Sequence, residues 1–350
     1  MKKLLRFAVL GFAFGLILSG CSKNENKREV RKPSNNIDST LWIDNLIDGK
    51  AAATKENKKI FLFFSGDDQD ESSAQLKEKI FNTSDFMDEM LSSYVLVNLD
   101  FSNSLFEKAS ADPLASEEEK AIAAELWVKL EENMRDAGVY NIQATPSFFL
   151  LTKEGYVITE LVFDNEPQKA SDVLGEIESR AEQIVEYENT LASCRTGKAK
   201  DRLEAINKLF DRTEPQLRYL LTDLSDDYIK LDKKNKTGMV GAHVVAKANA
   251  KAVQFYLDQD PASASEEFAK AAASKYLKPD QKQQCYYTAG YLFSQSGTED
   301  YAKVKEYFQK AYDADPTSVY AETIQSMMRM MDERYLDAPA ATTDESSAQE

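Results

Sequence analysis

Thiols are the side chains of this 350-residue sequence with the clearest capacity for covalent chemistry, and there are three of them. Cys21 follows an apolar segment near the N-terminus, whereas Cys194 and Cys285 lie far apart in the second half. In a CxxC pair, one thiolate attacks a disulfide and the second cysteine resolves the mixed disulfide. Neither Cys194 nor Cys285 has such a neighbour. They could form a disulfide in an oxidising compartment, but we expect buried free thiols because free cysteine is commonly buried.

The N-terminus predicts a targeting segment that ends before Cys21. Basic residues at positions 2, 3 and 6 precede the apolar run Phe7–Leu18, which is too short to span a bilayer. The run ends in Leu18-Ser19-Gly20-Cys21, which matches the bacterial lipobox. The match implies that residues 1–20 are a signal peptide and that acyl chains on Cys21 anchor the protein to a membrane on the periplasmic side. Ser22, which is not an aspartate, favours the outer membrane by analogy with enteric sorting.

Composition limits the other partners. The formal net charge of −16 argues against nucleic acid. Residues 21–40 and 337–350 contain little apolar surface, so we expect a disordered tether and a disordered tail. His243 has no nearby acid or nucleophile in the sequence, so a structural role is expected. No motif for a cofactor is visible.

The stretch from Lys58 to Phe86 organises the first half of the chain. Ile60–Phe64 is an unbroken apolar run, typical of a strand buried on both faces. A short acidic turn follows, and then a predicted helix with Leu76, Ile80 and Phe81 on one stripe. The spacing of the acidic residues partly mimics a calcium loop, but Ser72 stands where that loop needs glycine. We therefore expect a capped helix start and no metal.

Further elements are predicted from apolar patterns. They are a helix over 42–55, a strand over 94–100, an irregular insertion over 102–116, a helix over 117–137, strands over 147–151 and 157–163, and a helix over 170–186.

This order, together with Ala144-Thr145-Pro146, resembles the thioredoxin-like superfamily in the branch common in bacterial envelope proteins. The resemblance implies an α/β thioredoxin-like fold, a central mixed sheet with flanking helices, over residues 41–186, and a cis peptide bond before Pro146. Leu76 and Phe81 match the family's active-site motif, but its two cysteine positions hold Asp70 and Ser73. Positions 63 and 64, where the family places a proton-transfer acid, are both phenylalanine. The resemblance also implies a groove for an extended chain, lined by Gly66, Asp67, Asp68, Thr145 and Pro146.

From residue 187 to 336 the sequence predicts helices alone. The spacing of Tyr286, Gly290, Phe308, Ala311 and Pro316 resembles one tetratricopeptide repeat, with a weaker copy 40 residues earlier. A capping helix is expected over 317–335, and its methionines could form an adaptable surface or simply pack. A polar linker is expected over 193–201.

Two functions remain open from the sequence. The first is a non-catalytic envelope lipoprotein whose two domains bind protein or peptide. The second is an envelope thiol–disulfide oxidoreductase that uses Cys194 or Cys285. The missing CxxC favours the first, because reactivity requires an activated thiolate.

Overall fold

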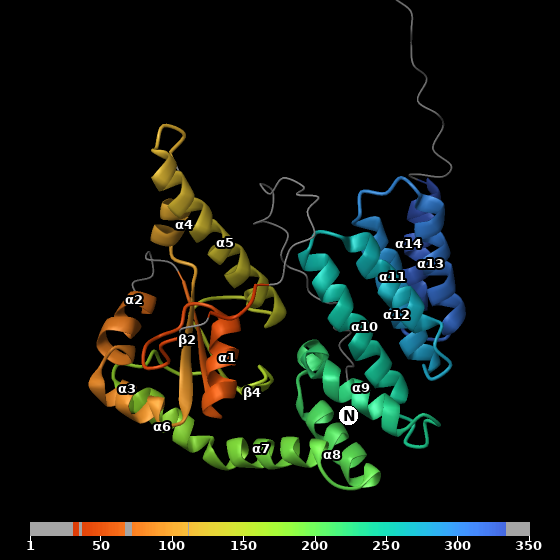
Figure 1. Ribbon diagram of the computed structural model, residues 1–350. Coiled ribbons are helices and arrows are strands. Elements are labelled where there is room, and N and C mark those ends of the chain that lie inside the picture. The colour runs from red at the N-terminus through yellow and green to blue at the C-terminus, as the bar shows by residue number, and fades with distance from the viewer. Residues whose placement is uncertain (1–30, 35–36, 67–71, 111, 334–350) are drawn as a thin grey trace, which may run out of the picture. The chain divides into compact units, whose positions relative to one another are not determined.

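The computed structural model describes residues 31–34, 37–66, 72–110 and 112–333 (Figure 1). The chain divides into two compact units, the first ending at Leu221 and the second beginning at Thr222. The boundary expected at residue 187 instead lies inside helix α7 (Ala181–Arg195). The polar stretch over 193–201 is not a linker, because α7 continues to Arg195 and helix α8 begins at Ala199. Its polar residues form the exposed turn of a helical hairpin.

The first unit is built on a mixed four-stranded sheet in the order β2-β1-β3-β4. Its strands are β1 (Lys59–Ser65), β2 (Tyr94–Asp100), β3 (Ser147–Leu151) and β4 (Val157–Leu161). β1 pairs parallel with β2 and antiparallel with β3, and β3 pairs antiparallel with β4. The central place of β1 explains its unbroken apolar run, since both of its faces are covered.

Helices flank this sheet and continue after it (Figure 1). They are α1 (Leu46–Glu56), α2 (Ser72–Leu76), the π-helical turn η2 (Lys77–Phe81), α3 (Ser84–Leu91), α4 (Asn103–Ala109), α5 (Glu117–Val139), α6 (Ala170–Ser179), α7, α8 (Ala199–Arg212) and the 3₁₀ helix η3 (Pro215–Leu221).

Two predictions about these helices were wrong. The stretch over 102–116 is not wholly irregular, because Ser102 caps α4 by accepting the N–H of Leu105, and Leu105 packs in one cluster with Leu130 of α5. The helix expected over 170–186 is two helices that meet at Arg180. The Arg180 guanidinium binds both Glu176 and Thr159, which fixes this junction to the sheet.

Side chains of β1 alternate between two apolar layers. Ile60, Leu62 and Phe64 belong to a cluster that includes Tyr140. Phe61 and Phe63 point the other way, into an aromatic cluster. The members of that cluster are Trp42, Phe61, Phe63, Phe81, Phe86 and Phe148. Each fully buried phenylalanine contributes about 1.5–3 kcal/mol, so the two layers hold the end of β1 in a fixed position.

Helices α7 to η3 are attached to the sheet by polar contacts. Glu188 of α7 pairs with Lys59 of β1 at 3.4 Å, and Arg195 pairs with Glu154 at 2.8 Å. The hydroxyl of Tyr219 in η3 donates a hydrogen bond to the backbone carbonyl of Val139, at the end of α5. These contacts give a physical reason why the first unit extends beyond the sheet to Leu221.

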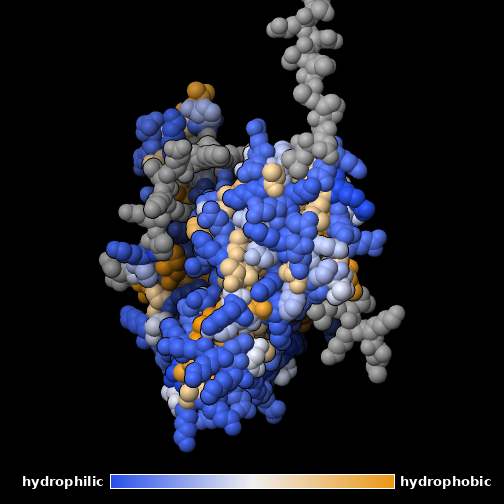
Figure 2. Space-filling model, turned by 90° about the vertical axis from the view of Figure 1, so that its right-hand side faces the viewer, coloured by the Kyte–Doolittle hydropathy of each residue, from blue (hydrophilic) through white to orange (hydrophobic). Residues whose placement is uncertain are grey.

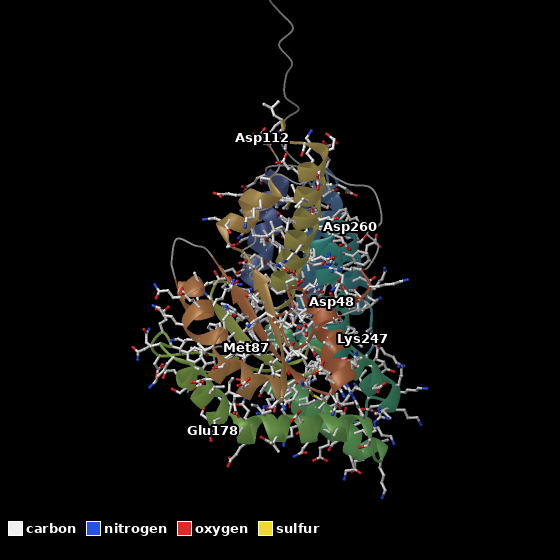
Figure 3. The ribbon with its side chains drawn as sticks, turned by 60° about the vertical axis from the view of Figure 1, so that its left-hand side comes forward. Asp48, Met87, Asp112, Glu178, Lys247 and Asp260 are labelled. Carbon is white, nitrogen blue, oxygen red and sulfur yellow. The ribbon has the colours of Figure 1, made fainter. Side chains whose placement is uncertain are left out.

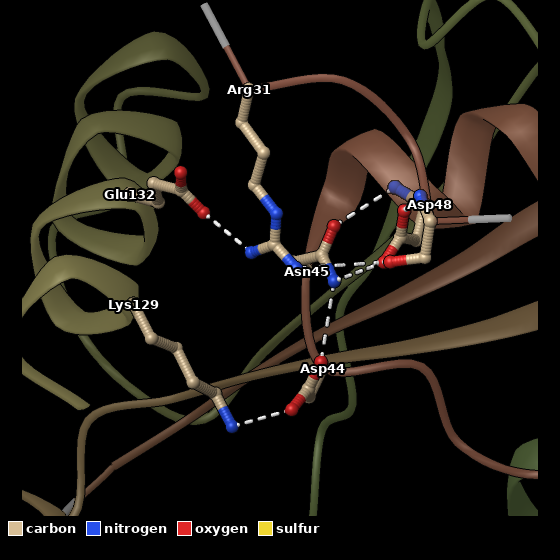
Figure 4. A network of polar contacts seen from close by, with 7 residues as sticks. Arg31, Asp44, Asn45, Asp48, Lys129 and Glu132 are labelled. Atoms are coloured by element: carbon tan, nitrogen blue, oxygen red, sulfur yellow. Dashed lines mark hydrogen bonds and ion pairs between the residues drawn. The ribbon is translucent and has the colours of Figure 1, made fainter. Parts of the chain in front are cut away.

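The segment that enters the first unit is held by a polar network (Figure 4). Arg31 donates to Glu132 of α5 at 2.9 Å and lies 3.8 Å from Asp48 of α1. The N–H and hydroxyl of Ser34 both donate to Asp48, at 2.6 and 2.8 Å. Burial raises the pKa of Asp48, but hydrogen bonds from Asn45 and Ser34 outweigh this effect and lower it. The disordered tether expected over 21–40 is therefore wrong for residues 31–34, which are fixed to α1 and α5.

The described part of the second unit is helical, as expected. Its helices are α9 (Thr222–Leu231), α10 (Val240–Leu257), α11 (Pro261–Ala272), α12 (Pro279–Ser294), α13 (Tyr301–Ala314) and α14 (Ala321–Met331). Gly290 of α12 lets α13 approach, because a Cβ there would lie 3.1 Å from the ring of Phe308. The resemblance to tetratricopeptide repeats stays a prediction.

Hydrophilic residues dominate the molecular face shown in Figure 2, and hydrophobic residues form small groups on it.

Candidate functional site

The candidate site lies at the end of β1, where the chain turns toward α2. The backbone N–H of Gly66 donates a hydrogen bond to the Ser73 hydroxyl at 3.1 Å. Only 4% of Ser73 is exposed. Ser73, which the resemblance places at the family's second cysteine position, therefore has a buried hydroxyl that links α2 to the end of β1.

Gly66 also contacts the loop before β3. A Cβ at Gly66 would lie 1.7 Å from Thr145 Oγ1, so only glycine fits against this threonine. The peptide bond between Thr145 and Pro146 is cis, as the resemblance implies. The structure thus brings together Gly66, Thr145 and Pro146 from two segments distant in the sequence. The other predicted positions at this site, Asp67, Asp68 and Asp70, lie outside the described residues, as does the predicted lipidation site Cys21.

An ion pair that sequence reasoning missed borders the site. Asp100 ends β2 and accepts hydrogen bonds from the Ser65 hydroxyl at 3.2 Å and the Ser102 N–H at 3.1 Å. Lys77 Nζ lies 3.8 Å from Asp100 Oδ1 and 5.9 Å from the ring centroid of Phe63. Parallel neighbours end at the same edge of a sheet. The parallel pairing of β1 with β2 could therefore have placed Asp100 beside Ser65. The position of Lys77 could not be predicted in this way, because it depends on the π-helical turn η2.

Among the described residues, the end of β1 offers few groups for proton transfer. Phe63 and Phe64 occupy the positions that could hold an acid, and both are fully buried. Asp100 is fixed by its hydrogen bonds and its pair with Lys77. The side chains described here can position a bound chain by hydrogen bonding and charge.

Both cysteines of the described residues are buried free thiols, as expected. Cys194 lies in α7 and Cys285 in α12, and neither exposes measurable surface. Burial raises the pKa of Cys285 to about 12. This thiol stays protonated at neutral pH, and a protonated thiol is a poor nucleophile.

His243 has a nucleophile beside it in space that sequence spacing did not show. Its Nδ1 lies 3.0 Å from the Ser225 hydroxyl, and its ring stacks on Tyr228 at 4.0 Å between centroids. Both His243 and Ser225 are completely buried, so no substrate can reach them in this conformation. This arrangement fits the structural role expected for the histidine.

The described residues contain neither a cluster of metal ligands nor a membrane-spanning helix. Within residues 31–34, 37–66, 72–110 and 112–333, no group of three or more histidine, cysteine or acidic side chains is arranged to hold a metal ion. Over the same ranges, no helix has both the length and the apolar character needed to cross a membrane.

Family models match two parts of the chain. A thioredoxin-like domain matches residues 48–174, and a family described as an uncharacterised protein C-terminal domain matches residues 239–335. Comparison with curated proteins and with solved structures gave no match. The first match covers the sheet and its flanking helices, including the turn at Gly66 and the cis bond at Pro146. The chain therefore contains a thioredoxin-like domain with a mixed four-stranded sheet, followed by a helical C-terminal region.

Proposed function

We propose that this protein is an envelope lipoprotein, anchored through Cys21, whose thioredoxin-like domain binds protein or peptide without thiol–disulfide chemistry. One observation carries the proposal. At the second cysteine position, Ser73 is buried and accepts the Gly66 N–H. A serine oxygen cannot resolve a mixed disulfide, and Asp70 cannot form one. In this proposal Ser73 is a structural residue that ties α2 to the end of β1.

The binding surface we propose is the edge of the loop beside Pro146, just before β3. Strand β3 itself is already paired with β1 and β4, so an extended segment would form its backbone hydrogen bonds with this loop, and side chains would select the partner. Thr145 and Gly66 would form its wall, and Asp67, Asp68 and Asp70 supply negative charge in the sequence. A basic or neutral segment is therefore the preferred ligand. The helical region, with its predicted repeats, offers a second binding surface.

Insulin reduction with a trace of dithiothreitol tests the redox part of the proposal. We expect no turnover above background. The alternative, an oxidoreductase that uses Cys194 or Cys285, finds less support because both thiols are buried. Turnover that disappears in Cys194→Ala or Cys285→Ala would establish that alternative.

The membrane anchor is tested by intact mass and acyl-label incorporation. We expect cleavage before Cys21, acyl chains on Cys21, and release of Cys21→Ala from the membrane fraction. An unmodified Cys21 would contradict the anchor.

Binding is tested by capture of partners with the lipidated protein from its own envelope. Ala144 is exposed next to Thr145, so Ala144→Arg should block the edge without disturbing the core. Glu178→Lys, on the exposed side of α6 (Figure 3), is the matched control. A partner lost with Ala144→Arg and kept with Glu178→Lys supports the groove. Equal capture by both variants would remove the groove from the proposal.

A further inference from the structure

The hairpin of α7 and α8 contains a groove that the thioredoxin-like match does not include. Its volume is about 770 Å³. All of its lining residues belong to these two helices. They are Ala181, Glu182, Val185, Glu186, Asn189, Thr190 and Ser193 of α7, with Asp201, Glu204, Ala205 and Lys208 of α8.

The spacing of these residues shows that the groove runs along the helices. On α7 they recur every three or four residues from Ala181 to Ser193, and on α8 from Asp201 to Lys208. Twelve steps of 1.5 Å give the α7 side a length of about 18 Å, or three helical turns. The groove therefore has the length and direction of a third helix packed against a helical pair.

The floor of the groove is apolar and accessible. Val185 lies near its centre and exposes 56% of its surface. Ala181 and Ala205 flank it with short side chains, which let another backbone come close. The larger apolar side chains of the same helices, such as Ile206 and Leu209, are buried. A partner side chain that covers Val185 would stabilise a complex, because it would remove from water apolar surface that the hairpin itself leaves exposed.

The walls of the groove are acidic. Four lining residues carry carboxylates, and Lys208 is the only lining residue with a positive charge. Glu186 already pairs with Lys208 at 2.7 Å and with Arg212 at 3.2 Å. Glu182, Asp201 and Glu204 form no ion pair with any residue in the described part of the chain. Three carboxylates along an apolar floor complement a ligand that is apolar on one side and basic at its edges.

We propose that the α7–α8 groove binds a basic amphipathic helix of a partner protein, in a three-helix arrangement. The formal charge of −16 opposes a second copy of this chain as the occupant, since like charges would meet. The proposal does not depend on the edge beside Pro146 or on the lipid at Cys21.

The experiment is calorimetric titration of the full chain with a synthetic peptide of about 15 residues, long enough to form a helix on binding. The peptide has alanine and leucine at every third or fourth position and lysine elsewhere. A scrambled peptide of the same composition, without the apolar stripe, is the ligand control. We expect the amphipathic peptide to bind with a one-to-one stoichiometry and the scrambled peptide to bind at least about tenfold more weakly.

Variants of the protein locate the site. Glu182→Lys with Glu204→Lys should weaken binding by about tenfold or more, because like charges would then face the lysines. Glu178→Lys, outside the groove, makes the same type of charge change and should leave the affinity unchanged. Val185→Asp tests the apolar floor and should also weaken binding. Equal binding of both peptides, or loss of affinity with Glu178→Lys as large as with the groove variants, would overturn the proposal. Ala144→Arg should have no effect here, so failure of the groove beside Pro146 can be told from failure of this one.

Discussion

At Asp136, burial and neighbouring charges act in opposite directions on one carboxyl group. Burial raises its pKa, Lys50 lowers it and Glu132 raises it, with a resulting value of about 6. Lys50 is itself affected, because burial lowers the pKa of its ammonium group. The folded protein therefore holds a proton on Asp136 over a range where an exposed aspartate has lost it.

This difference predicts how stability depends on pH. Between about pH 4 and 6 the folded state binds more protons than the unfolded state, so the free energy of unfolding falls as pH rises. The contribution of Asp136 is about 1–3 kcal/mol over that window. Asp136→Asn should remove this pH dependence. The free energy of unfolding of the variant should therefore rise relative to that of the wild type between pH 4 and 7. Urea unfolding at several pH values measures this, with Glu178→Gln as an exposed control. Parallel curves for Asp136→Asn and wild type would refute the assignment.

Single residues also show how far sequence reasoning reaches at this site. The alignment of Leu76 and Phe81 with the family motif places Ser73 at a cysteine position and so predicts the loss of the CxxC. The role of Ser73 was not visible, because its hydrogen bond to Gly66 requires the turn geometry. Lys77 was missed for a related reason, since a π-helical turn changes which side of the segment it faces.

At the scale of elements, the end of β1 packs so closely against the loop before β3 that one added methyl group at Gly66 should lower stability. Gly66→Ala would place Cβ 1.7 Å from Thr145 Oγ1, so one segment must move. Overpacking of this kind costs about 1–3 kcal/mol. Gly175→Ala in α6 is the matched control, because nothing lies within 4 Å of its Cβ position. That change should stabilise the helix by about 0.5–1 kcal/mol. Thermal unfolding of both variants gives the comparison, and equal effects would show that the loop yields without cost.

The elements that sequence predicted well have strong apolar patterns. Residues 60–64 and 94–100 lie in β1 and β2. The apolar runs Ile60–Phe64 and Tyr94–Val97 are uninterrupted, and such runs have few alternatives to a buried strand. Helix α4 was missed because its seven residues bury only Leu105 and Ala109. The break between α6 and α7 was missed because Arg180 reaches from the helix junction to Thr159 of β4, a contact invisible in a one-dimensional pattern.

At the scale of the whole molecule, the change from strands to helices near residue 187 was a poor guide to the boundary. Helices α7, α8 and η3 belong to the first unit, where ion pairs such as Arg195 with Glu154 connect them to the sheet domain. A fragment of residues 31–221 should therefore fold, whereas one ending at residue 186 should lose stability. Limited proteolysis and circular dichroism of the two fragments provide the test. If the fragment ending at residue 186 resists proteolysis as well as the longer one, the domain boundary lies near residue 187 after all.

The aromatic cluster around Trp42 has a practical consequence for experiments on the two units. The sequence has two tryptophans, Trp42 and Trp127, and both lie in the first unit. Trp42 is surrounded by rings, with Phe61 at 6.0 Å and Phe81 at 5.7 Å between centroids. Tryptophan emission therefore reports on the thioredoxin-like unit alone, while the second unit emits only through its tyrosines. Selective excitation of tryptophan can therefore follow unfolding of the first unit without any label, whereas excitation of tyrosine reports on both units, because Tyr94, Tyr140 and Tyr187 lie in the first.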